Sequence, residues 1–62
     1  MKEAATITFT DAETLKEAVA IVRYDEALVA ICFSHEANGD IEVVMPKVQA
    51  KLFLKALQSA VE

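Results

Sequence analysis

The dipeptide Asn38-Gly39 constrains the fold of this chain more than any other feature, because it stands between two runs typical of β-strands. The apolar run Ala27–Phe33 precedes it and the run Ile41–Met45 follows it. Both central residues of a tight type I′ turn need positive φ angles, which Asn and Gly tolerate best. The sequence therefore predicts a β-hairpin over residues 27–46, around which the rest of the chain must be arranged.

A two-residue turn at Asn38-Gly39 also predicts the register of this hairpin. It places Phe33 opposite Val44, and directly opposed residues share a face of the sheet. One face is then expected to hold Leu28, Ala30, Cys32, Ser34, Ile41, Val43 and Met45, and the other Val29, Ile31, Phe33 and Val44, with His35 and Glu42 paired near the turn. Since both faces are mainly apolar, this hairpin is expected to be covered on both sides or along its edge.

Two helices and one further strand are predicted outside the hairpin. Residues 5–10 alternate apolar and Thr side chains, which is typical of a half-buried strand. Residues 10–13, Thr-Asp-Ala-Glu, have the spacing of a capping box, and apolar residues then recur at helical spacing, so a helix is expected over 11–24. Pro46 is expected to end the last strand and to open a closing helix over 47–61.

These elements predict an α+β fold in one small domain, residues 1–62, with the order β-α-β-β-α. The expected architecture is a three-stranded sheet with two helices packed on one face, which is a ferredoxin-like split β-α-β unit without its last strand. Two strand orders remain open. The last strand can lie between the other two, in the order 1-3-2, or the strand over 28–33 can lie in the middle, in the order 1-2-3.

The apolar content predicts self-association. Hydrophobic residues make up 55% of only 62 residues, and the apolar side chains of the closing helix cover about 200° of arc, which is wider than one contact face requires. Chains this short bury only about 60% of their unfolded surface, and one cysteine cannot form an intrachain disulfide. We therefore expect a homodimer that closes through the sheet face, a strand edge or the closing helix. The expected partner-binding residues are Val29, Ile31, Phe33, Val44, Phe53, Leu54, Leu57 and Val61.

The charge distribution suggests an alternative. The formal net charge of −4 argues against general affinity for nucleic acid, but Lys47, Lys51 and Lys55 recur at intervals of four residues along the closing helix. A solvated helix face is the simplest interpretation of this pattern. The alternatives are a surface that contacts another protein or a nucleic-acid-associated regulator that binds through the three lysines.

Few residues suggest catalysis. Adjacent side chains on a strand point to opposite faces, so Ser34-His35-Glu36 cannot form a hydrolytic relay, whereas a His35–Glu42 pair could orient an imidazole in an enzyme site. The simpler interpretation of that pair is a surface contact, and that of Cys32 is a small buried hydrophobe. A single glycine, already in the turn, leaves none for a phosphate-binding loop, and we expect no cofactor and no metal.

The location of the chain is predicted from two further patterns. Its longest apolar run, Ala27–Phe33, is far shorter than the roughly 18 residues that span a bilayer. The first residues lack the apolar core of a secretory signal. The sequence is therefore expected to be that of a soluble, cytoplasmic, non-catalytic interaction module.

Overall fold

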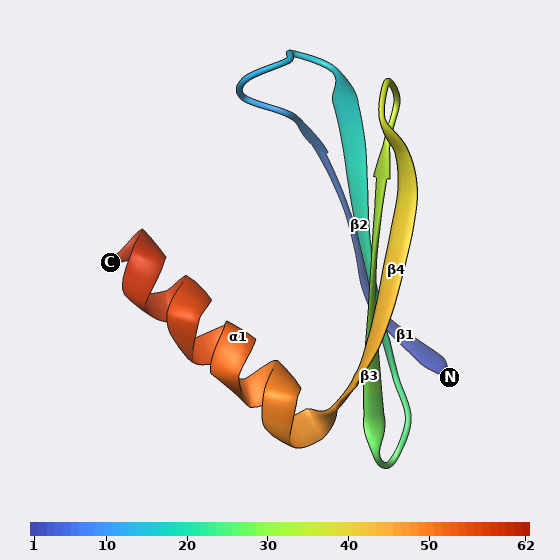
Figure 1. Cartoon of the computed structure of the whole chain (residues 1–62), viewed down its shortest axis with the longest axis vertical. Coiled ribbons are helices and arrows are strands. Elements are labelled where there is room, and N and C mark those ends of the chain that lie inside the picture. Colours follow the sequence, from blue (N-terminus) through green and yellow to red (C-terminus); the bar gives the residue numbers. More distant parts are fainter.

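The computed structural model describes all 62 residues, which form a four-stranded antiparallel sheet followed by one helix (Figure 1). The strands follow one another in space as in sequence, in the order β1-β2-β3-β4. Their bounds are Lys2–Thr10 for β1, Glu17–Tyr24 for β2, Leu28–His35 for β3 and Gly39–Pro46 for β4, and the helix α1 spans Lys47–Val61. The predicted three-stranded sheet with two helices is therefore wrong, as are both strand orders that went with it.

The helix expected over residues 11–24 is replaced by a loop and a strand. The carboxylate of Asp11 accepts hydrogen bonds from the amides of Glu13 (2.8 Å) and Thr14 (3.2 Å), and the Leu15 amide donates to the Asp11 carbonyl (2.8 Å). One helical turn forms in this way. Leu15 then has a φ of 62°, and a residue in this left-handed region ends a helix. The capping signal at Asp11 is thus satisfied by a single turn.

The chain is extended again over β2 because its residues favour a strand. Val19 and Ile21 are β-branched, and their stiff side chains fit a pleated sheet better than a helix. They alternate with Ala18 and Ala20, which are buried on the other face. A pattern with a period of two residues therefore underlies the helical spacing that suggested a helix.

The predicted hairpin forms, but with a different turn and register. His35 is paired with Gly39 and Phe33 with Ile41, so that Glu36, Ala37 and Asn38 form the connection. Gly39 has a φ of 85°, whereas Asn38 does not have a positive φ, and the predicted type I′ turn at Asn38-Gly39 is wrong. The register differs by three residues from the predicted one. Because this number is odd, the β4 side chains exchange faces relative to those of β3.

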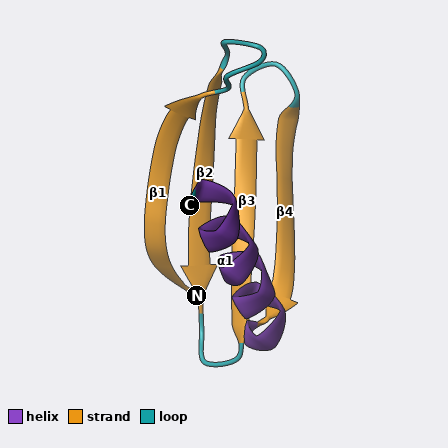
Figure 2. Ribbon diagram, turned by 90° about the vertical axis from the view of Figure 1, so that its left-hand side faces the viewer, coloured by secondary structure: helices purple, strands orange, loops and turns teal.

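The sheet has one apolar and one mixed face. We call the side over which α1 lies the helix face and the opposite side the outer face (Figure 2). The pairing places Ile7, Phe9, Ala18, Ala20, Val22, Val29, Ile31, Phe33, Ile41, Val43 and Met45 on the helix face. It places Thr6, Thr8, Thr10, Val19, Ile21, Arg23, Leu28, Ala30, Cys32, Ser34, Asp40, Glu42 and Val44 on the outer face. The expectation that Val44 shares a face with Phe33 is therefore wrong.

The core of this fold is small. Only four residues are buried, and all of them belong to the sheet: Ala18, Ala20, Ala30 and Met45. The closing helix has the predicted bounds, with Pro46 at its N-cap, but it contains no buried residue. Nor is α1, the single helix, long and apolar enough to cross a membrane. A single copy of the chain thus leaves most of its apolar side chains in contact with solvent.

Candidate interaction surface

An apolar groove lies between α1 and the helix face of the sheet. It encloses about 400 Å³. Its walls are formed by Val22, Val29 and Ile31 from the sheet and by Lys47, Ala50, Lys51, Leu54 and Leu57 from the helix. The sheet side of this groove exists because β2 and β3 direct alternate aliphatic residues to the same face. The helix side exists because the groove-lining residues recur every three or four positions along α1.

The apolar surface continues from the groove towards the β3–β4 turn. Phe33 and Ile41 are opposed on the helix face, where they are 49% and 62% exposed. Leu54 and Leu57, on the helix, are 55% and 63% exposed. Large apolar side chains that stay this accessible on facing elements mark a surface that is available to a partner.

Most of the residues predicted to bind a partner are brought together here. Val29, Ile31, Leu54 and Leu57 line the groove, and Phe33 lies on the same sheet face. Three predicted residues do not line the groove: Val44 lies on the outer face, Phe53 lines a separate shallow hollow, and Val61 follows Leu57 in the last helical turn. That hollow encloses about 150 Å³ and is lined by Gln49, Leu52, Phe53 and Ala56. The helix therefore presents apolar side chains in two directions, towards its own sheet and away from it.

The three lysines differ in their surroundings. Lys47 and Lys51 line the apolar groove, whereas Lys55 does not. The ammonium of Lys47 lies 5.9 Å from the centre of the Tyr24 ring, within the range of a cation–π contact. Lys47 therefore already has an intramolecular partner, which weakens the case for three lysines acting together on a phosphate backbone.

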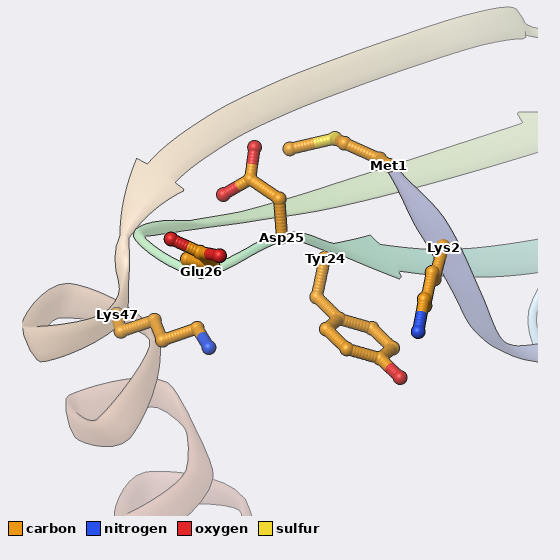
Figure 3. A pocket seen from close by; sticks show the side chains of 6 residues that line it. All are labelled: Met1, Lys2, Tyr24, Asp25, Glu26 and Lys47. Atoms are coloured by element: carbon orange, nitrogen blue, oxygen red, sulfur yellow. The ribbon is translucent and has the colours of Figure 1, made fainter.

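A second hollow, of about 530 Å³, lies where the chain start, the β2–β3 turn and the helix start meet (Figure 3). Its lining residues are Met1, Lys2, Tyr24, Asp25, Glu26 and Lys47. The Asp25 carboxylate accepts hydrogen bonds from the amides of Ala27 (2.9 Å) and Leu28 (2.8 Å), which lower its pKa, with a smaller contribution from nearby positive charge. Asp25 therefore holds the turn, and the two lysines and two acids in this hollow do not select one ligand charge.

The predicted His35–Glu42 pair is not formed. His35 is paired with Gly39 and lies on the helix face, while Glu42 is paired with Cys32 on the outer face. There the Glu42 carboxylate forms an ion pair with the Arg23 guanidinium. The shift in hairpin register is the cause, and the predicted cross-strand pairing of His35 with Glu42 is wrong.

His35 instead ties the β3–β4 turn to the loop that follows β1. Its Nδ1 accepts hydrogen bonds from the amides of Ala37 and Asn38, both at 3.1 Å. Its Nε2 lies 3.2 Å from Asp11 Oδ2 and 3.2 Å from Thr14 Oγ1. Because the carboxylate and the hydroxyl meet the same ring nitrogen, they do not form a relay through the imidazole. The side chain is 14% exposed and holds two loops together.

The carboxylate of Asp11 is stabilised in its charged form. The backbone amides of Glu13 and Thr14 make the largest contributions to a lowered pKa, and partial desolvation opposes them. The nearby His35 lowers the pKa further. Through these contacts Asp11 stabilises the conformation of the loop between β1 and β2.

The remaining candidates for chemistry are separate from one another. The hydroxyl of Ser34 donates to Asp40 on the outer face, away from His35. Cys32 is a free, half-buried thiol in the middle of β3, opposite Glu42 rather than Met45. Nowhere do three His, Cys, Asp or Glu side chains converge.

Several residues of the apolar surface were missed by the sequence analysis. Val22 and Ala50 line the groove, and Ile41 and Val43 extend the helix face, yet none of them was among the predicted partner-binding residues. The period of two residues in Ala18, Ala20 and Val22 could have indicated the β2 contribution. Comparison with family models, with curated proteins and with solved structures finds no match to this chain.

Proposed function

We propose that this chain is a non-catalytic interaction module that acts as a soluble, cytoplasmic homodimer. In this proposal its helix face and α1 form the surface through which two copies associate. The observation that carries the proposal is the amount of surface that one copy leaves exposed.

A compact protein of this mass has a smaller surface than this chain. Its accessible surface is 4903 Å², whereas a folded monomer of 6.8 kDa is expected to have about 3,950 Å². The excess is about 950 Å², and each partner of a stable protein interface typically buries about 800 Å². One additional copy is therefore sufficient to cover it.

The dimensions of the chain support the same proposal. The radius of gyration is 12.6 Å, and a compact domain of 62 residues is expected to have about 10.6 Å. The difference arises because α1 diverges from the sheet instead of lying flat on it (Figure 1). With neither a disulfide nor a large core, association is the available source of further stability for a chain of this length.

The nucleic-acid alternative has less support. It needs an exposed row of lysines, whereas Lys47 contacts Tyr24 and Lys51 lines an apolar groove. Binding to single strands also relies on exposed aromatic side chains within a basic surface, and this chain has a net charge of −4. We therefore favour association between copies over binding to nucleic acid.

The mass in solution tests the proposal. We expect light scattering at micromolar concentration to give twice the mass of one chain. Phe33→Glu and Leu57→Glu each place a charge on the proposed interface and should shift the mass towards one chain. In a monomer these positions would face water, so the same substitutions would leave mass, solubility and stability unchanged.

Thr8→Glu provides the matched control. Thr8 is an exposed strand residue on the outer face, so a new carboxylate there should leave the dimer intact. A wild-type mass of one chain, together with unaltered behaviour of Phe33→Glu, would overturn the proposal.

A further inference from the structure

Only one end of α1 is attached to the sheet. The Lys47 amide donates to the Ala27 carbonyl (3.2 Å) in the β2–β3 turn, which fixes the start of the helix. Apart from the Lys47 ammonium, which lies over the Tyr24 ring of β2, the helix packs beside β3 and β4. Figure 1 shows that the helix then moves progressively away from the sheet towards its C-terminus. The helix and the sheet thus enclose a wedge that is closed at Lys47 and open at the other end.

Both walls of this wedge are apolar. Phe33, Ile41 and Val43 line the sheet side towards its open end, and Leu54, Leu57 and Val61 follow along the helix. Contact between the two walls would remove these side chains from solvent, yet all six are exposed. The wedge is therefore too wide to be closed by the side chains of one copy.

The charge of the chain favours a particular occupant. Residues 1–46 hold nine acidic and three basic residues, whereas residues 47–62 hold three basic residues and one acidic residue. An apolar helix with a basic flank is thus attracted to the acidic sheet portion of another copy, whereas two sheet portions repel each other. The α1 helix of a second copy has this combination of an apolar surface and a basic flank, and it presents apolar side chains on two of its sides.

We infer that α1 of a second copy fills the wedge, so that the two helices pack against each other between the two sheets. This inference rests on the proposed homodimer and specifies its geometry. Each helix keeps Ala50 and Leu54 on the groove beside its own sheet and reaches the open part of the partner's helix face near Ile41. A two-fold axis makes the two contacts equivalent and closes the assembly at two copies.

Disulfide formation between separately made chains tests this geometry. In a Cys32→Ser background, Ile41→Cys and Leu57→Cys are purified as two proteins, mixed under reducing conditions until the subunits have exchanged, and then oxidised. A covalent product of twice the chain mass that forms much more in the mixture than in either protein alone shows that the sheet of one copy meets the helix of another. Thr8→Cys mixed with Leu57→Cys is the control, because Thr8 lies on the outer face, and it should give no such product.

The outcomes separate this inference from the proposed function. A dimeric mass with the Ile41–Leu57 product supports both. A dimeric mass without that product, or with an equal product from the Thr8 control, overturns the helix exchange and leaves the homodimer in place. A mass of one chain overturns both.

Discussion

The imidazole Nε2 of His35 lies 3.2 Å from Asp11 Oδ2, and this contact joins the end of β3 to the loop after β1. The two residues are 24 positions apart in the sequence. The other ring nitrogen, Nδ1, accepts two backbone amides of the β3–β4 turn. A nitrogen that accepts hydrogen bonds carries no proton, so the ring proton of neutral His35 is on Nε2, directed at Asp11.

His35→Ala should therefore destabilise the chain by about 1–2 kcal/mol, because two turn amides lose their acceptor and Asp11 loses its contact with β3. Denaturant unfolding at matched protein concentration measures this loss. His35→Asn, whose side-chain oxygen can replace Nδ1 as an acceptor, should recover part of it. Nitrogen-15 spectra of the wild type should show the Nε2–H tautomer at neutral pH, and an Nδ1–H tautomer would contradict the arrangement.

Leu15 provides the second prediction, because its left-handed backbone is unfavourable for a side chain. Its φ is 62°, and the side chain is 75% exposed, so little burial compensates the strain. Leu15→Gly should raise the free energy of unfolding by about 0.5–1 kcal/mol. Leu15→Asn should give a smaller gain, since Asn also tolerates this region. Leu15→Val, which is branched at Cβ, should lower the stability, and a stabilising Leu15→Val would show that the backbone is not strained there.

The same loop explains why the first half of the fold was predicted wrongly. Leu15, Ala18, Val19 and Val22 match one helical face, and Asp11 supplies a genuine capping signal, so local patterns favoured a helix. The helix is terminated after one turn, and the segment pairs with strands on both sides, with Phe9 opposite Ala18 and Ala20 opposite Phe33. Pairing between distant residues decided the outcome, and a single sequence does not reveal that pairing.

The second half was predicted more accurately because its signals are local. Pro46 marks the boundary between β4 and α1, and both hairpin strands formed where apolar runs indicated them. The predicted register failed because Gly39 alone takes the positive φ, which moves Val44 to the outer face and brings Val43 to the helix face. The candidate site shows the same difference. Spacing along a single element identified Leu54 and Leu57 on α1 and Val29, Ile31 and Phe33 on β3, whereas the β4 residues Ile41, Val43 and Val44 depended on the register set by one turn.

Asp25 provides a prediction about pH. Its pKa is lowered in the folded chain by the amides of Ala27 and Leu28, so the unfolded chain binds a proton more readily than the folded one. Stability from this group is therefore present above the ordinary pKa of 3.8 and is lost as the pH falls through the lower folded value. Asp25→Asn should lower the melting temperature at pH 7, and the difference from wild type should narrow as the pH falls below 3.8.

The control for Asp25 is Glu26→Gln, which removes a neighbouring acid. An equal narrowing in that variant would show that general charge, and not the two turn amides, is responsible. Asp11 is held by the same type of contacts and should respond to acid in the same direction.

Arg23 and Glu42 provide the last prediction, which separates the effect of an ion pair from that of side-chain cover. Arg23 is on β2 and Glu42 on β4, so the Arg23 side chain crosses β3, where its paired residue Ala30 is only 1% exposed. The two side chains remain 43% and 41% exposed, and a pair of this kind contributes less than about 1 kcal/mol. Glu42→Gln should therefore lower the free energy of unfolding only slightly, and this loss of stability should become smaller in high salt. Arg23→Ala should lower the stability more than Glu42→Gln does, and this loss should depend little on salt, because the substitution uncovers Ala30. Arg23→Met keeps an aliphatic chain over β3 and should recover most of the lost stability. Equal, salt-dependent losses in Arg23→Ala and Arg23→Met would instead assign the contribution of Arg23 to its charge.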